Sequence, residues 1–368
     1  MNQFDQKMIS ECLELAKKAL GRTSPNPLVG AVVVKNGQIV GRGFHPRAGL
    51  PHAEVFALKQ AGEEARGATI YVNLEPCNHH GKTPPCTEAI IKAGISQVVV
   101  GMVDPDERVA GGGIKRLVAA GIDVKVGVEE EACRQLNEAF IHRVIYKRPF
   151  GILKYAMTVD GKIATATGDS KWITGQKSRD YVHFLRSGCD AVVVGGNTVR
   201  KDNPRLTTHG MSSHNPLRVV MSKGFDLPMD CHLWDTTMAP TVVFTLLQDV
   251  DSPLKTYLLS RGVEVLEYEN LSPTVVMDSL YERGFNSVFW ECGGNLGARA
   301  IASGMIQKVL GFIAPKIIGG QGGFNPVGDL DINAMQDALK LHNVSLQRFD
   351  DDFLIEGYIK QWTMDNGQ

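Results

Sequence analysis

Short apolar runs alternate with amphipathic segments through the first 145 residues. The runs are rich in Val and Ile and have the length of strands, whereas the segments between them repeat their apolar positions with the period of a helix. We expect strands at 29–34, 37–44, 68–74, 96–102 and 122–127, and helices at 1–20, 53–61, 86–94, 113–121 and 129–145. Because strands alternate with helices, the pattern predicts a mostly parallel sheet with helices on its faces.

A second series of strands and helices follows Pro149. Proline cannot continue a helix, so the first series must end before it, and we place a boundary between domains 1–147 and 148–368. We expect strands at 150–158, 189–195, 217–222, 241–246, 263–268, 286–291, 307–315 and 351–359, and helices at 176–187, 274–284 and 295–303. Both halves therefore have the α/β pattern.

Charge and cysteine content narrow the class of protein. The 368 residues carry 39 basic and 40 acidic side chains, a formal net charge of -1. This balance argues against a broad surface for nucleic acid or an anionic membrane, while a local pocket for one phosphate fits it. Seven scattered cysteines indicate reduced thiols, with at most one pair on a metal. No apolar run reaches 18 residues, so we expect a cytoplasmic protein without a membrane span.

The stretches PHAEV (51–55) and EPCNHHGKTPPC (75–86) contain the residue types of a zinc site that activates water. A catalytic zinc needs three protein ligands and one open position, and His52, Cys77 and Cys86 can supply the ligands. Zinc lowers the pKa of its water towards about 7, and a carboxylate must then carry the proton to the leaving amine. Glu54 lies in the first turn of a helix that His52 opens, so we expect it to be the catalytic proton shuttle. The set predicts deamination by zinc hydroxide.

Each of these residues alone has a simpler explanation, as a surface histidine or a small core cysteine. The combination of His-Ala-Glu, Pro-Cys and a cysteine at a helix start makes that explanation the weaker one. One departure remains, because the usual zinc deaminase signature is H-x-E with P-C-x-x-C. This chain has eight residues between the two cysteines.

Four stretches resemble the deaminase half of the bifunctional riboflavin-biosynthesis deaminase/reductase family: SPNPLVGAVVV, GRGFHPRAGLPHAEVFAL, NLEPCNHHGKTPPCTEAII and DPDERVAGGGIKRL. In that family the long loop between the cysteines is the rule. The resemblance implies a cytidine-deaminase-like fold for the first domain. It also implies the substrate 2,5-diamino-6-ribosylamino-4(3H)-pyrimidinone 5′-phosphate, which is deaminated to the corresponding uracil.

The loop between the cysteines suits a phosphorylated pyrimidine, because it brings donors and a cation to the rim of the zinc site. An amide held between the two prolines of SPNP can read a pyrimidine edge. The substrate contacts that we expect are Asn26, His45, His80, Lys82 and Thr83. The alternatives are that SPNP is only a turn and that the loop histidines are only solvated.

The second half carries glycine-rich turns between strands and helices, which bring backbone N–H groups to phosphates. GGNLG (293–297) follows one expected strand, and VGGNTV (194–199) repeats the arrangement after another. A tight turn explains either alone, and two in one domain favour a nucleotide cofactor. These stretches, with LKYAMTVDGKIATATGDSKWITG, are similar to the reductase half of the same family. That resemblance implies a dihydrofolate-reductase-like fold and NADPH, which reduces the ribosyl side chain to give 5-amino-6-(5-phosphoribitylamino)uracil.

By motif position, the resemblance implies two sets of contacts in this half. The cofactor contacts are Ala156, Trp172, Thr198, Asp202, Gly293, Gly294, Asn295, Leu296, Gly297, Ala298 and Arg299. The substrate contacts are Ser170, Arg186, Leu206 and Glu291, to which we add Lys154 and Asp160 at the ribityl end. A guanidinium binds phosphate bidentately, so we expect Arg186 to be the phosphate clamp, unless it is only a solvated helix residue.

One position departs from the family pattern. Some members carry an arginine where this chain has His209, and Arg205 is the residue that can replace it as a second phosphate contact. Trp172 also has an alternative role as a cap on the core. Family members commonly form dimers or tetramers, so we expect a homo-oligomer.

Two other functions compete with the bifunctional enzyme. One is a nucleoside or nucleic-acid deaminase with a non-catalytic C-terminal domain, which the near-neutral charge disfavours. The other is a binding protein that has lost its chemistry, which the intact zinc set disfavours. We therefore expect a small phosphorylated pyrimidine as substrate, with no nucleic acid and no membrane as partner.

Overall fold

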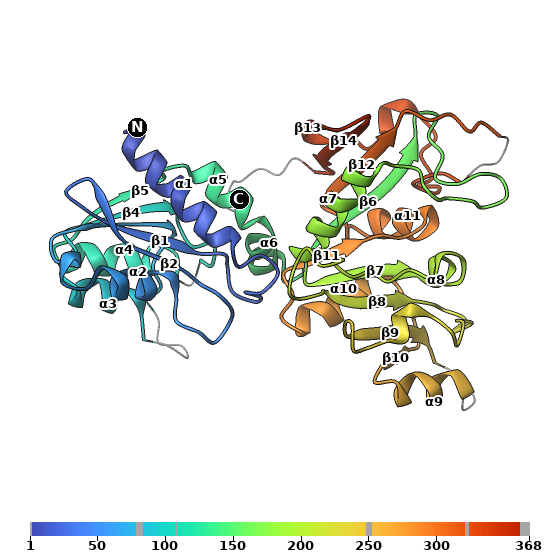
Figure 1. Cartoon of the computed structure of the whole chain (residues 1–368), viewed down its shortest axis with the longest axis horizontal. Helices are drawn as coiled ribbons and strands as arrows, with labels where there is room; N and C mark the ends of the chain where they lie inside the picture. The colour runs from blue at the N-terminus through green and yellow to red at the C-terminus, as the bar shows by residue number, and fades with distance from the viewer. Residues whose placement is uncertain (1, 79–83, 108, 248–251, 321–323, 361–368) are drawn as a thin grey trace. The chain divides into compact units, whose positions relative to one another are not determined.

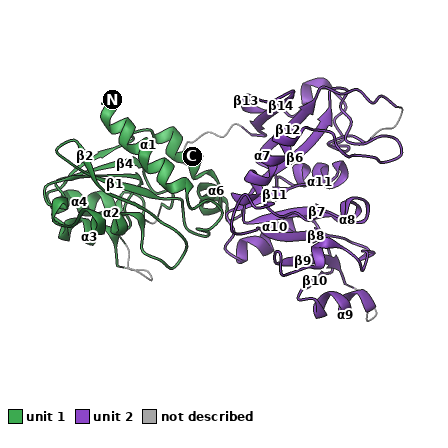
Figure 2. Cartoon of the chain, in the orientation of Figure 1, with its two compact units in different colours: residues 1–147, 364–368 green, residues 148–363 purple. Residues whose placement is uncertain are grey.

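Helix α6 (Glu138–Tyr146) ends at Lys147, which takes a left-handed conformation (φ 54°) two residues before Pro149. The chain divides at this point into two compact units, Met1–Lys147 and Arg148–Thr363 (Figure 2). The computed structural model describes residues 2–78, 84–107, 109–247, 252–320 and 324–360. Within those ranges, no helix is long and apolar enough to cross a membrane.

The first unit is a five-stranded sheet with helices on both faces (Figure 1). Its strands are β1 (Gly30–Lys35), β2 (Gln38–Phe44), β3 (Thr69–Leu74), β4 (Gln97–Met102) and β5 (Asp123–Val126), in the order β2-β1-β3-β4-β5. Its helices are α1 (Gln3–Lys17), α2 (Ala53–Ala61), the 3-10 turn η1 (Gly62–Ala65), α3 (Cys86–Lys92), α4 (Gly112–Ala119), α5 (Glu130–Leu136) and α6. Strands β3, β4 and β5 are parallel, whereas β1 is antiparallel to both of its neighbours, so the sheet is more mixed than expected.

Glycines let the helices approach this sheet closely. A Cβ at Gly30 of β1 would lie 2.0 Å from the carbonyl oxygen of Cys12 in α1. On the other face, a Cβ at Gly43 of β2 would lie 2.2 Å from the carbonyl oxygen of Ala53 in α2. These contacts fix α2, whose N-terminus carries the expected zinc ligand and proton shuttle, directly on the sheet.

The single long helix expected at 129–145 is two helices, α5 and α6, which meet at Asn137. The side chain of Asn137 is buried, accepts from Leu28 N (2.8 Å) and donates to Leu28 O (3.0 Å). This pairing with a segment distant in sequence holds Asn137 at φ -103° and ψ 17°, away from helical values. The helices predicted on either side of Asn137 are present, and the contact with Leu28 breaks the helix between them.

The second unit is a nine-stranded sheet in the order β10-β9-β8-β7-β11-β6-β12-β14-β13. Its strands are β6 (Phe150–Thr158), β7 (Ala191–Gly195), β8 (Leu217–Met221), β9 (Thr241–Leu246), β10 (Glu264–Tyr268), β11 (Ser287–Trp290), β12 (Lys308–Ala314), β13 (His342–Phe349) and β14 (Asp352–Tyr358). Its helices are α7 (Gln176–Ser187), α8 (Gly196–Asp202), α9 (Pro253–Ser260), α10 (Pro273–Glu282) and α11 (Gly294–Ala302), with 3-10 turns η2 (His232–Trp234) and η3 (Met335–Asp337). The strands from β10 to β12 are parallel, and β14 and β13 add an antiparallel hairpin.

Each face of this second sheet has its own apolar core. Alternate residues of β7 enter different cores: Val192 and Val194 pack with α7, α8 and α9, whereas Ala191 and Val193 pack with α10 and α11. The period of two along the strand produces this division. Because the strands are parallel, their carboxyl ends lie along one edge, where binding sites of open α/β sheets form.

Candidate active sites

Three side chains from separate elements of the first unit converge on one point. His52 precedes α2 as its N-cap, Cys77 follows β3, and Cys86 is the first residue of α3. His52 Nδ1 lies 3.2 Å from Cys86 Sγ and 3.4 Å from Cys77 Sγ, and all three ligand atoms lie within 4.8 Å of one another. Nitrogen and sulfur ligands of a tetrahedral zinc ion are about 3.5 Å apart. The residues therefore fit a zinc ion.

The two cysteine side chains influence each other's ionisation. Their mutual interaction lowers the pKa of Cys77 and raises that of Cys86. The Cys86 backbone N–H points to Cys77 Sγ over 3.4 Å. Contact with Cys77 also raises the pKa of His52. Zinc binds thiolates, so its binding to this set would release any proton that a cysteine still carries.

Glu54 lies in the first turn of α2 and is only 3% exposed. Burial, together with the charge of Cys77, raises the pKa of its carboxyl to about 7. Its Oε2 atom is buried and has no hydrogen-bond partner among the described residues. Because buried polar atoms are nearly always satisfied, this oxygen is open to a hydrogen bond from a polar group that binds beside the zinc ligands.

Asn26 and His45, two of the expected substrate contacts, lie together next to His52. Asn26 Nδ2 lies 3.0 Å from His45 Nε2, and His45 Nδ1 lies 3.1 Å from the carbonyl oxygen of Pro51. The His45 ring meets the His52 ring edge to face, with centroids 5.3 Å apart. Burial lowers the pKa of His45, so it is neutral, with Nδ1 as donor and Nε2 as acceptor. The expected contacts His80, Lys82 and Thr83 lie outside the described residues.

Glu75 was not among the expected site residues, yet it binds backbone groups of the described segments 104–107 and 109–114 close to the zinc ligand Cys77. Its buried carboxylate accepts from four backbone N–H groups, at distances of 2.9 to 3.2 Å: those of Asp104, Gly111, Gly113 and Ile114. The sequence hints at this role only through the position of Glu75, two residues before the ligand Cys77. The donors are backbone N–H groups, which every residue except proline has, so they leave no pattern in the sequence.

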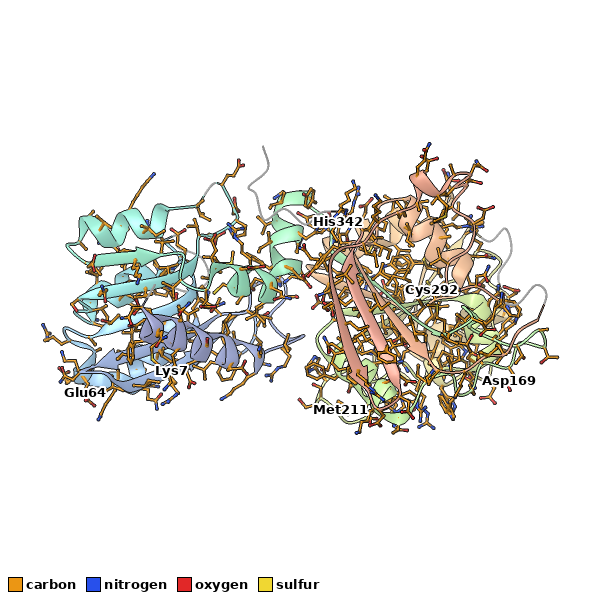
Figure 3. All side chains as sticks on the ribbon, turned by 90° about the horizontal axis from the view of Figure 1, so that it is seen from above. Lys7, Glu64, Asp169, Met211, Cys292 and His342 are labelled. Atoms are coloured by element: carbon orange, nitrogen blue, oxygen red, sulfur yellow. The ribbon has the colours of Figure 1, made fainter. Side chains whose placement is uncertain are left out.

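The second unit has a pocket of about 1460 Å³ along the carboxyl ends of β8, β7 and β11. Cys292, labelled in Figure 3, is one of the side chains that border it. All the described residues that line this pocket belong to the second unit. The volume exceeds that of common small-molecule sites, about 300–1,000 Å³, and is large enough for a dinucleotide beside a second reactant.

A buried carboxylate and two cations lie at the end of β11. Arg186 Nη2 donates to Glu291 Oε2 over 3.0 Å, Arg186 Nε bonds the other carboxylate oxygen, and Lys154 Nζ lies 3.9 Å from Oε2. Burial opposes the charge of Glu291, but Arg186 and then Lys154 outweigh it and lower the pKa of Glu291. Arg186 Nη1 also donates to Thr207 O (2.9 Å). The Arg186 guanidinium, which we expected to bind a phosphate, therefore binds the carboxylate of Glu291 in this structure. The phosphate contact of Arg186 stays a prediction.

Two glycine turns form a cradle in the middle of the pocket. A Cβ at Gly294, at the start of α11, would lie 2.5 Å from the carbonyl oxygen of Asn325. A Cβ at Gly196, at the start of α8, would lie 2.8 Å from Ser222 Oγ. A side chain at either turn would collide with these neighbours, so both turns need glycine for close packing. Leu296 N and Gly297 N both donate to Gly293 O, at 3.1 and 3.0 Å, whereas the N–H groups of Gly294 and Asn295 precede the first helical bonds and can bind a phosphate, so the turn fits a dinucleotide.

Most of the residues expected in the second half line this pocket. Those that do are Lys154, Ala156, Ser170, Trp172, Arg186, Thr198, Asp202, Arg205, Leu206, Glu291, Gly293, Gly294, Asn295, Leu296 and Arg299. Asp160, Gly297 and Ala298 are not among its described lining residues. Asp160 instead accepts from Thr158 Oγ1 (2.6 Å) and Gly319 N (2.8 Å), which closes a turn, and Gly297 and Ala298 are buried in α11. The carboxylate of Asp160 thus supports the turn, and its contact with the substrate stays a prediction.

Two residues of α7 that line the pocket, Arg179 and His183, are among those that the sequence did not indicate. Arg179 lies over the ring of the exposed Trp172, 4.5 Å from its centroid. His183 stacks on His209, with centroids 4.0 Å apart and planes 13° from parallel. The spacing of Arg179, His183 and Arg186 along one helix face is the signal that could have identified them. His232 borders the pocket with no such signal.

The two sites indicate an enzyme with two centres: one unit has the ligand set of a zinc-dependent deaminase, and the other has a large pocket beside a buried carboxylate and glycine turns. Comparison with protein-family models agrees. Residues 2–102 match the cytidine and deoxycytidylate deaminase zinc-binding region, and residues 149–355 match the RibD C-terminal domain.

Relatives match the whole chain. The riboflavin biosynthesis protein RibD of Synechocystis sp. is 57% identical over 364 residues, covering 99% of this chain and 98% of that protein. The RibD of Aquifex aeolicus is 42% identical, covering 96% of this chain and 98% of that protein.

Two solved structures also match nearly the whole chain. An Acinetobacter baumannii RibD has a TM-score of 0.86 at 35% identity, covering 97% of this chain and 99% of the other. A Thermotoga maritima deaminase/reductase has a TM-score of 0.85 at 40% identity, with the same coverage. The chain belongs to the RibD family and is a bifunctional deaminase and reductase of riboflavin biosynthesis. The α/β class and the expected family are confirmed. The alternative of a deaminase with a non-catalytic second half is not supported, because residues 149–355 match the RibD C-terminal domain and the whole chain matches bifunctional relatives.

Proposed function

We propose that residues 1–147 deaminate 2,5-diamino-6-ribosylamino-4(3H)-pyrimidinone 5′-phosphate and that residues 148–368 reduce the product with NADPH. The second step gives 5-amino-6-(5-phosphoribitylamino)uracil. The observation that supports the first step best is the buried Glu54 oxygen without a partner, next to the set His52, Cys77 and Cys86. The relative from Thermotoga maritima is named for both activities.

In the first unit, zinc held by His52, Cys77 and Cys86 would supply a water of lowered pKa. Glu54 takes the proton of that water on its carboxylate and passes it to the leaving amine. Neutral His45 keeps Asn26 in place, so that the amide can face the pyrimidine edge. Lys82 and Thr83, with His80, contribute the contacts to the ribose phosphate.

In the second unit, NADPH would lie with its phosphates at the turn Gly293–Arg299 and would supply the hydride. Glu291 holds Lys154 and Arg186 at the end of β11, where the open-chain ribosyl group meets the cofactor. Trp172, braced by Arg179, closes the cofactor side. Arg205 makes no ion pair among the described residues and lines the pocket, which supports it as a phosphate contact. The expected homo-oligomer stays a prediction.

The test of the first step is Glu54→Gln. This variant keeps the zinc ligands, so metal analysis should find the wild-type zinc content, while the release of ammonia from the diaminopyrimidine ribotide should fall by about 10³-fold. Supplied with the deaminated pyrimidine, the variant should oxidise NADPH at the wild-type rate. Full ammonia release by Glu54→Gln would remove Glu54 as the proton shuttle, and a wild-type chain that fails to oxidise NADPH would refute the second step.

A further inference from the structure

The segment from Asn203 to His209 forms one wall of the reductase pocket in an unfavourable backbone conformation. Its residues Asn203, Pro204, Arg205, Leu206 and His209 line the pocket. Asn203, Leu206 and His209 have φ of 42°, 54° and 49°, in the left-handed region. Such conformations cost about 1 kcal/mol or more each in non-glycine residues, and they persist only where surrounding contacts hold them. Contacts from residues outside this segment must therefore hold its backbone in place.

Arg218, in the parallel strand β8, makes such contacts. It is 1% exposed. Its two terminal nitrogens donate to backbone carbonyl oxygens, whereas its buried Nε has no partner among the described residues. Nη1 bonds Arg205 O and His232 O, both at 3.3 Å. Nη2 bonds Leu233 O (2.9 Å), Asp235 O (2.8 Å) and Ala239 O (2.7 Å). A buried cation with five carbonyl acceptors joins the strand β8 to the pocket wall and to the segment 232–239.

The segment 232–239 is in turn bonded to the wall at both ends. His232 N donates to Asn203 Oδ1 (2.8 Å). The Asn215 side chain accepts from Thr208 N (2.7 Å) and donates to Met238 O (2.8 Å). Arg218 therefore reaches the wall directly at Arg205 and indirectly through His232 and Asn203. Burial lowers the pKa of Arg218 to about 10, so it remains charged at neutral pH.

We propose that Arg218 is a positioning residue for the reduction: it holds the wall Asn203–His209 in the form that meets the pyrimidine substrate. Arg218 is not among the described residues that line the pocket, so it acts through the wall rather than on a reactant. The proposal rests on the proposed function, because it assumes that the deaminated pyrimidine binds against this wall. The cofactor turn at Gly293 follows another strand, β11, and none of the five Arg218 bonds reaches it.

The test compares Arg218→Lys and Arg218→Met with the wild-type chain. Lysine keeps the charge but has three donors on one nitrogen, so it cannot reach all five carbonyls. Losing the bond to the wall should raise the KM for the deaminated pyrimidine about tenfold in either variant. The Kd of NADPH, measured by fluorescence titration, and the deaminase rate of the same chain should not change. The matched control is Arg283→Met, which removes an exposed ion pair with Glu264 and should leave every one of these values unchanged.

A second pair of variants tests the bond between His232 N and the Asn203 side chain. These variants also test the proposal if Arg218→Met does not fold. Asn203→Gly keeps the left-handed conformation accessible but deletes the acceptor of His232 N, so it should raise the same KM. Asn203→Asp keeps an acceptor and should raise that KM less. A wild-type KM in Arg218→Lys would overturn the proposal, as would an equal loss of NADPH affinity, which indicates a general structural role. A wild-type chain that does not reduce the deaminated pyrimidine would refute the proposed function and this inference with it.

Discussion

Glu291 balances two cations that the second unit buries, Arg186 and Lys154. Removing one partner of such a group leaves uncompensated charge away from water. We predict that Glu291→Gln abolishes NADPH oxidation and lowers the free energy of unfolding by about 3 kcal/mol. Thermal unfolding and a reductase assay with the deaminated pyrimidine measure the two effects. In the control Glu264→Gln, the exposed pair with Arg283 is lost, which should cost less than about 1 kcal/mol and leave activity intact. Reductase activity in Glu291→Gln would contradict the role of this carboxylate.

His183 makes the second unit sensitive to acid. Burial, then the charges of Arg186 and His209, lower the pKa of His183 to about 4. The unfolded chain binds this proton below its ordinary pKa of about 6.5, whereas the folded chain does not until pH 4. The folded state therefore loses stability as the pH falls from 6.5 to 4. We predict that the Tm falls less between pH 7 and pH 5 in His183→Phe, which keeps an aromatic ring against His209. An equal fall in both proteins would contradict the assignment.

The zinc residues could be predicted from the sequence because their chemistry requires a particular set of residue types at particular positions relative to strand and helix ends. The stack of His183 and His209 could not be predicted, since one residue lies on α7 and the other in a loop that only the folded chain brings to it. The pairing of Arg186 with Glu291 across 105 residues was missed for the same reason, although both residues were expected in the pocket. Side-chain partners set by tertiary structure leave no local pattern.

At the scale of elements, the packing of α2 on β2 determines where Glu54 lies. A methyl group at Gly43 would lie 2.2 Å from Ala53 O and 2.6 Å from Ala57 N, both of them backbone atoms of α2. We predict that Gly43→Ala displaces α2, lowers the zinc content and reduces the deaminase rate at least about tenfold, because a small misplacement of reacting groups is costly. The reductase rate should not change.

The control for this variant is Gly112→Ala, at a helical glycine where an added Cβ meets nothing within 4 Å. Metal analysis and ammonia release should find this control equal to the wild type. If Gly43→Ala keeps its zinc and its deaminase rate, the close contact between α2 and β2 does not control the site.

The order of strands and helices was largely predictable, because buried strands are apolar throughout and the helices between them are amphipathic. Strand β13 was missed since nearly all of its side chains are exposed, so it has no apolar pattern. Helix α8 was missed because it begins in the glycines of a turn, and α9 because it is short. The break at Asn137 depends on a backbone partner 109 residues away. Local pattern thus identifies elements with a buried face, and long-range contacts decide where some of them end.

At the scale of the whole molecule, each site is built from one unit only. The zinc set lies within Met1–Lys147, and the described lining of the reductase pocket lies within Arg148–Thr363. We predict that full-length Glu54→Gln and Glu291→Gln chains, each unable to make the ribityl product alone, make it when mixed with NADPH and the diaminopyrimidine ribotide. The intermediate must then pass through solution from one chain to the other. Mass analysis of the products checks this, and a mixture that accumulates only the deaminated pyrimidine would contradict it.

The location of each site within one unit also affects how the two activities can be lost in evolution. A single substitution at Glu54 or at Glu291 can silence one step while the other half keeps its complete set of reacting groups. After duplication of the gene, selection could therefore retain two copies that have each lost a different step. Each copy would then catalyse one of the two steps and would keep the other domain in a folded but inactive form.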